Sequence, residues 1–167
     1  MRRSLFTLLA LAAVVAAAPA GAKNWARDLA GDDEDKRTRA AQELMGKARE
    51  EGLTGDEIMA LAEAVDDPSD EIQRYAITAL ASNTKIATSE QYAPYYANRG
   101  NNFVAFLLWY SIHNTYEGFV DLTGGPGPGD AEDEMEYAQK EAFRAFDNML
   151  DPERKGWAEP FVEEISE

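Results

Sequence analysis

The sequence contains no cysteine, and this absence removes several classes of protein at once. Without a thiol there is no disulfide, no cysteine nucleophile, no thiolate metal site and no cysteine that could accept a lipid. Any folded domain of this chain is therefore stabilised by packing and by polar contacts alone.

Histidine and basic side chains are also scarce. The 167 residues include one histidine and 16 lysines and arginines against 31 acids, which gives a net charge of −15. A negative charge of this size repels nucleic acids and anionic lipid surfaces, so we expect no nucleic-acid partner. It attracts cations and basic proteins. Solubility or adaptation to a saline medium explains the same charge without a partner, and the buffering of cations by bulk charge is a third interpretation.

Long apolar runs are missing except near the start, where residues 1–22 have the order of a secretory signal peptide. Two arginines precede an apolar run over residues 5–18, and A-x-A motifs end at Ala20 and Ala22. The run is shorter than the roughly 20 apolar residues of a membrane-spanning helix. We therefore expect cleavage near Ala20 or Ala22, a periplasmic or secreted protein, and no stable membrane insertion afterwards.

Strand-like alternation is absent from residues 23–167, whose length suits one domain. Apolar residues recur there at helical spacing instead. We predict an all-α protein, either an α-α superhelix or an irregular bundle of about six to seven helices. The Gly/Pro segment 124–129 is predicted to be a loop, because glycine and proline disfavour both helix and strand.

Capping signals predict where these helices begin. Thr54 and Glu57 have the spacing of a capping box, and Asn24 and the acidic run 32–35 precede other apolar stripes. The pairs Asp67-Pro68 and Asp151-Pro152 predict an N-cap followed by proline at the first helical position. Further starts are predicted at Thr88 and Asp130.

A helix from residue 103 to about 117 is apolar all round, so we expect it to be the buried centre of the domain and to end near Gly118.

Two segments align at an offset of 36 residues: 36–44 lie over 72–80, and an acid-rich turn precedes each. In the first copy an arginine, paired alanines, a leucine and a glycine follow the turn, at Arg37, Ala40, Ala41, Leu44 and Gly46. With these residues the chain resembles the HEAT-like helical repeat family over about residues 32–82. The second copy departs from the pattern at Gln73, Ile77 and Ser82. The resemblance implies a protein-interaction scaffold; a plain helical bundle remains the alternative.

Tyr92, Tyr95, Tyr96 and Arg99 form the main candidate binding surface. Their spacing places them on one face of a helix, and tyrosine and arginine are enriched at interface hot spots. The alternative is that this face packs on the helix at residues 103–110, with only the hydroxyls at the rim.

His113, the one histidine, is a further candidate binding residue. Glu117 one turn later would favour its protonated ring and could orient it for acid–base chemistry. The alternative is a polar residue that closes the edge of the core. None of the acidic clusters 32–35, 66–70 and 130–136 has the spacing of a calcium loop, so we predict no metal site and no cofactor.

We therefore expect an exported helical-repeat module that binds another protein, with a basic partner favoured by the charge. We expect this module to have no catalytic activity of its own, and we assign no catalytic residue. The alternative function is a small extracytoplasmic hydrolase that uses carboxylates assisted by His113.

Overall fold

The computed structural model describes residues 24–123 and 131–166. The predicted signal peptide, the 124–129 loop and the predicted cap Asp130 lie outside these residues. The described part is all helical, as predicted, with eight helices: α1 Trp25–Leu29, α2 Glu34–Glu50, α3 Gly55–Ala64, α4 Asp70–Ala81, α5 Ile86–Asn98, α6 Asn102–Thr123, α7 Ala131–Asp147 and α8 Pro152–Glu164. The number exceeds the prediction because the short segment after Asn24 forms a helix of its own.

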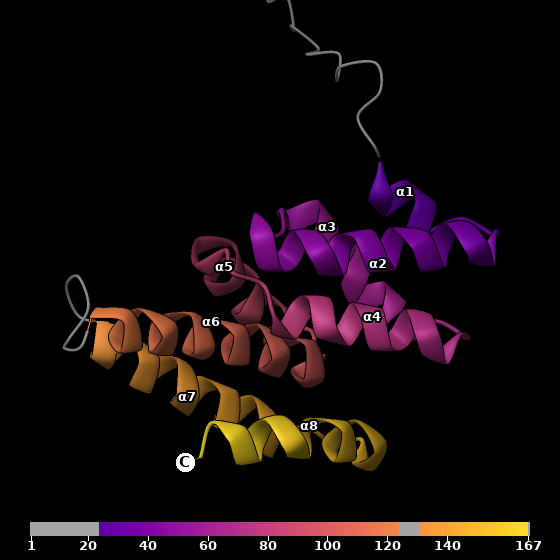
Figure 1. Ribbon diagram of the computed structural model, residues 1–167. Helices are drawn as coiled ribbons and strands as arrows, with labels where there is room; N and C mark the ends of the chain where they lie inside the picture. Colours follow the sequence, from indigo (N-terminus) through magenta and orange to yellow (C-terminus); the bar gives the residue numbers. More distant parts are fainter. Residues whose placement is uncertain (1–23, 124–130, 167) are drawn as a thin grey trace, which may run out of the picture.

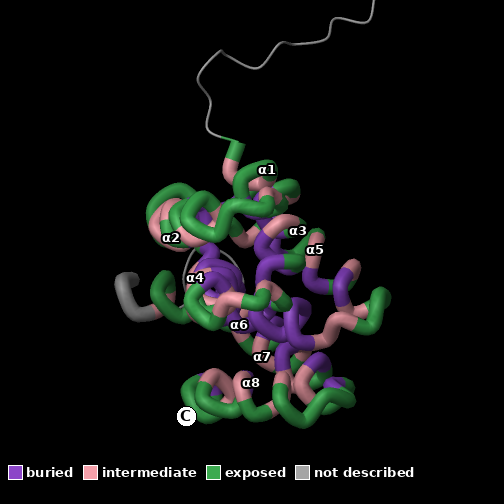
Figure 2. Tube along the Cα trace, turned by 90° about the vertical axis from the view of Figure 1, so that its right-hand side faces the viewer, coloured by how far each residue is buried: buried purple, intermediate pink, exposed green. Residues whose placement is uncertain are grey.

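The helices are arranged in successive layers along the molecule (Figure 1). Helices α1, α2 and α3 lie at one end, α4, α5 and α6 in the middle, and α7 and α8 at the other end. Contacts run from layer to layer, with α2 on α4, α4 on α6, and α6 on both α7 and α8. The middle layer therefore carries the core, and buried residues concentrate on α4 and α6 (Figure 2).

Helix α6 confirms the prediction of a buried apolar centre. Residues 104–108 are completely buried, and Trp109 and Tyr110 are nearly so. The helix is longer than predicted, because it runs past Gly118 to Thr123 and packs along α7. Packing on a neighbouring helix stabilises this stretch despite the low helix propensity of glycine. No helix in the described residues is both long and apolar enough to cross a membrane.

Three of the predicted caps are confirmed: Asn24, Thr54 and Asp151 each accept a hydrogen bond from a backbone amide in the first turn of the helix that follows. Within the acidic run 32–35, Asp33 caps α2 in the same way. At Thr54 the capping box is complete. These caps satisfy amides that would otherwise lack an intrahelical partner.

The predicted cap at Asp67-Pro68 is wrong. Helix α4 begins at Asp70, and its N-cap residue Ser69 makes no side-chain capping bond. The Asp67 carboxylate instead accepts from the Ser69 amide at 2.9 Å and from the Arg37 Nε at 2.8 Å. A partner 30 residues away in the sequence therefore holds the side chain in the loop before α4.

The helix start predicted at Thr88 is also misplaced, since α5 begins at Ile86. Thr88 and Ser89 are buried in its first turn, where the Ser89 hydroxyl accepts from the Asn83 side chain at 2.7 Å. Asn83 also accepts from the backbone amide of Leu53 at 2.8 Å. The hydroxyls therefore serve a buried polar connection between layers, and they do not cap the helix.

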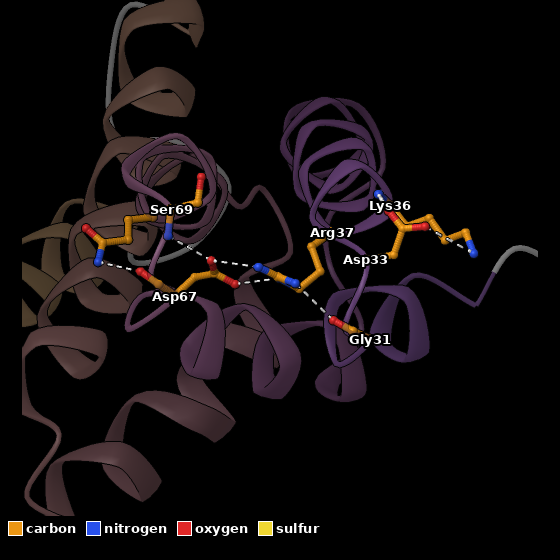
Figure 3. A network of polar contacts seen from close by, with 7 residues as sticks. Gly31, Asp33, Lys36, Arg37, Asp67 and Ser69 are labelled. Atoms are coloured by element: carbon orange, nitrogen blue, oxygen red, sulfur yellow. Dashed lines mark hydrogen bonds and ion pairs between the residues drawn. The ribbon is translucent and has the colours of Figure 1, made fainter.

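The 36-residue offset reappears in the hydrogen bonds. Arg37 Nη1 donates to the Gly31 carbonyl, and Gln73 Nε2 donates to the Asp67 carbonyl, each six residues earlier. Both donors and both acceptors are thus related by 36 positions. Figure 3 shows Arg37 between Gly31 and Asp67. Arg37 additionally joins the two segments, because its Nε bonds to Asp67.

Glu57 at the corner between α2 and α3 gives the first testable prediction. Its carboxylate accepts from Lys47 Nζ at 2.6 and 2.7 Å and from the Thr54 amide at 2.8 Å. Burial opposes ionisation, but these hydrogen bonds outweigh it and lower the pKa of Glu57. Stability from this group is therefore complete above the pKa of the unfolded chain and is lost as the pH falls through the lower folded pKa.

We expect Glu57→Gln to lower the free energy of unfolding at neutral pH by roughly 1 kcal/mol, a value that allows for solvent screening of the pair. The difference from the parent should shrink toward acidic pH, as measured by urea unfolding over a pH series. Glu50→Gln, at an exposed position of α2, is the matched control. A deficit that does not change with pH would contradict the ionic origin of the effect.

Candidate functional site

The structure brings the four residues predicted on the α5 face together. The ring centroids of Tyr92, Tyr95 and Tyr96 lie 5.2 to 6.5 Å from one another. The Arg99 Cζ lies 4.4 Å from the centroid of Tyr95, a cation–π contact. The four side chains therefore form one continuous cluster at the C-terminal half of α5, which we call the tyrosine cluster.

The members of the tyrosine cluster differ in exposure. Tyr96 is buried, Tyr92 and Tyr95 are half-buried, and Arg99 is exposed. Burial, with the neighbouring Tyr95 and Tyr92, raises the pKa of Tyr96 to about 12, so this hydroxyl stays neutral. Arg99 is therefore the most accessible member of the cluster, and the half-buried Tyr95 is the ring over which its guanidinium lies.

The cluster faces α3. The Tyr92 hydroxyl occupies the space that a Cβ on Gly55 would need, at the start of α3. Tyr95, Tyr96 and Arg99 line a surface cavity of about 270 Å³ together with α3 residues Met59 and Glu63. The alternative, in which this face only packs on the helix at residues 103–110, is therefore incomplete, because α3 also lies against the face.

This cavity adjoins two others, of about 450 and 620 Å³. The cavities of 270 and 450 Å³ share Asp66, Arg99 and Asn101. The cavities of 450 and 620 Å³ share Asn102, Asn148 and Leu150. The far end is lined by α5 and α7, with Trp109 of α6 between them. We call this continuous surface, from Met59 on α3 to Tyr137 on α7, the trough.

Two interhelical turns form the centre of the trough. Gly100 has a φ of +78°, which glycine adopts readily, and it ends α5. Asn101 caps α6 by accepting from the Val104 amide at 3.2 Å, and the Asn102 side chain donates to the Asn148 carbonyl at 3.0 Å. These bonds hold the turn after α5 against the turn after α7.

Next to this bond, Leu150 is 96% exposed. A single exposed leucine is common on folded domains, so Leu150 is informative only together with other exposed apolar side chains of the trough. Together with Met59 and Tyr137, which are 40% and 51% exposed, it places apolar surface along the full length of the trough.

The charges in the trough are mixed. Arg154 pairs with Asp66 and lies over the rings of Trp157 and Phe103, at 4.7 and 5.3 Å from their centroids. Burial lowers the pKa of Arg154. Arg144 contacts Glu141 at 3.5 Å. Within the described residues Arg99 pairs with no carboxylate, so its guanidinium keeps donors available for a ligand.

His113 does not line the trough. Its side chain is buried on α6, and Nδ1 lies 3.1 Å from the Asn114 side-chain oxygen. Glu117 is exposed, and no carboxylate in the described part of the chain bonds to the ring. The placement fits a polar residue at the edge of the core, and the structure does not join His113 to the tyrosine cluster.

No metal centre forms among residues 24–123 and 131–166, where no three histidine, aspartate or glutamate side chains converge to hold an ion. Two acids of the clusters 32–35 and 66–70 have structural roles instead. Asp33 caps α2, and Asp67 bonds to Arg37.

Sequence reasoning missed the asparagines and Leu150 in the trough. The only local signal is that Gly100-Asn101-Asn102 and Asn148-Met149-Leu150 interrupt helical patterns. The two turns meet because of packing between residues that lie 46 positions apart in the chain.

No protein-family model, curated protein or solved structure gives a significant match to this chain. Its function therefore has to be inferred from the trough and the surrounding side chains.

Proposed function

We propose that this chain is an exported helical-repeat module that binds another protein through the trough and has no catalytic activity of its own. The observation that carries the proposal is the combination of Tyr95, of an Arg99 that pairs with no carboxylate among the described residues, and of exposed apolar side chains along the trough. Aromatic and arginine anchors surrounded by polar groups are typical of protein interfaces.

The dimensions of the trough support a protein partner more than a small metabolite. It extends over parts of α3, α5, α6 and α7, and specific interfaces bury about 800 Å² on each partner. The chain's charge of −15 would accelerate the approach of a basic protein. We infer that the partner carries basic residues around an apolar contact.

The remaining parts of the proposal have separate support. The order of residues 1–22 favours export to the periplasm or the medium. The HEAT-like resemblance of residues 32–82 is supported by hydrogen bonds that recur after 36 positions. A hydrolase with His113 has less support, because the ring is buried beside Asn114.

The proposal predicts that Tyr95→Ala combined with Arg99→Ala weakens partner binding at least tenfold, since hot-spot residues contribute about 2 kcal/mol or more each. Tyr96 is left unchanged, because it is buried and its loss would test stability. The measurement is affinity capture from an envelope extract of the native host at low and high salt, followed by titration of the purified partner.

The matched control is Tyr75→Ala combined with Arg49→Ala, on α4 and α2 away from the trough. It should retain binding, and both double variants should retain the parent's helical circular dichroism spectrum. Equal capture by the trough variant and the parent would exclude the trough as the binding surface. Absence of any partner at either salt concentration would count against an interaction module and favour the hydrolase.

A further inference from the structure

A separate cavity lies between the end of α4, the middle of α6 and α8. Its volume is about 490 Å³, within the roughly 300–1,000 Å³ typical of small-molecule sites. Ala81, Phe119 and Phe161 provide apolar walls, and none of the residues lining it belongs to the trough. A ligand here would therefore be independent of the proposed protein partner.

Serine and threonine hydroxyls in the wall are oriented by the backbone. Ser82 donates to the Thr78 carbonyl at 2.6 Å, Ser111 to the Leu108 carbonyl at 2.7 Å, and Thr115 to the Ser111 carbonyl at 2.7 Å. A hydroxyl has one proton and two lone pairs. Since these protons point to carbonyls within the helices, the oxygens of Ser82 and Thr115 keep lone pairs for a ligand, whereas the Ser111 oxygen also contacts the Ser89 hydroxyl at 3.5 Å.

The electrostatic surroundings favour a cation. The ring of Tyr110 lines the same cavity, and burial together with the carboxylate of Glu164 raises the pKa of its hydroxyl. Glu164 is exposed on α8, and it places a negative charge beside this part of the wall. A ligand that donates hydrogen bonds and carries positive charge is complementary to this arrangement.

Gly118 provides part of the free space. A Cβ at this position would meet no atom within 4 Å, although the residue lies on the wall of the cavity. A larger side chain at this position on the wall would therefore fit without displacing the helix and would narrow the cavity.

We propose that this cavity binds a small amphipathic amine, with its apolar body against Phe119 and Phe161 and its ammonium group donating to the hydroxyl oxygens of the wall. The acceptor-rich wall selects the ammonium, and the aromatic rings select the hydrocarbon. This binding site is additional to the trough and does not depend on it.

The test titrates the full chain with 2-phenylethylamine, 2-phenylethanol and phenylacetate, followed by calorimetry and by NMR chemical shifts at neutral pH. We expect the amine to bind about tenfold more tightly than the alcohol, because hydrogen bonds to a charged group are stronger than neutral ones. Phenylacetate should bind most weakly. Equal affinities for all three compounds, or no saturable binding of the amine, would overturn the proposal.

Two glycines provide matched variants. Gly118→Leu should reduce amine affinity at least tenfold, whereas Gly46→Leu, whose Cβ also meets nothing within 4 Å but lies on α2, should leave it unchanged. Amine binding that survives Gly118→Leu would place the ligand elsewhere. As a second variant, Thr115→Val keeps the shape and removes one acceptor, so the preference for amine over alcohol should fall. An unchanged preference would contradict the role of the hydroxyls.

Discussion

Replacement of Gly52 by alanine is expected to lower the free energy of unfolding by about 2–4 kcal/mol, the sum of a backbone and a steric cost. Gly52 ends α2 with a φ of +76°, a conformation in which a Cβ is unfavourable. That Cβ would also overlap the Lys85 side chain and lie 3.0 Å from the Lys85 backbone nitrogen. Because Lys85 is the N-cap residue of α5, the clash would separate the first layer from the second.

Gly100→Ala separates the two costs. Gly100 has nearly the same φ, +78°, but its added Cβ would meet nothing within 4 Å. Only the backbone cost of about 1–2 kcal/mol should remain there. Urea unfolding followed by circular dichroism measures both variants. Equal losses would show that the contact with Lys85 adds nothing.

Phe106→Ala is expected to have the largest effect on stability, about 3–5 kcal/mol, because it removes a fully buried ring and leaves a cavity. The Phe106 ring lies 6.3 Å from Tyr110, 6.1 Å from Phe146 and 6.5 Å from Phe161, measured between centroids. It therefore joins α6 to both α7 and α8. The measurement is again the free energy of unfolding in urea.

Leu150→Ala is the control for this prediction. It also removes a large apolar side chain, but one that is 96% exposed, so stability should change by no more than about 0.5 kcal/mol. The same variant should weaken partner binding, since Leu150 lies in the trough. A loss for Phe106→Ala as small as that for Leu150→Ala would mean that the aromatic centre does not stabilise the layers.

The parts of the fold that the sequence predicts well are those decided within a few residues. Asn24, Asp33, Thr54 and Asp151 cap helices because each carboxylate, amide or hydroxyl oxygen finds an amide two or three residues ahead. The buried centre at α6 is similarly visible, since a helix without a polar face has to be enclosed.

The predictions that failed concern side chains that bond to other parts of the chain and do not cap the next helix. Asp67 has the same local signal as Asp151, yet it bonds to Arg37, and no sequence pattern distinguishes the two. Thr88 and Ser89 likewise resemble a cap but are buried against Asn83 and α6. In the candidate site, spacing correctly grouped Tyr92, Tyr95, Tyr96 and Arg99 on one helix face. The meeting of Asn102 with Asn148 depends instead on the packing of α6 on α7.

The contact of Arg154 with the α3–α4 loop determines the order in which the fold can be completed during synthesis. Arg154 bonds to the Val65 carbonyl and to Asp66, and the first of these contacts spans 89 residues. The ribosome produces the chain from its N-terminus, so the first layers form before this partner exists. Until residue 154 has been made, Asp66 and the Val65 carbonyl lack this guanidinium, so the α3–α4 loop is without its contact to α8.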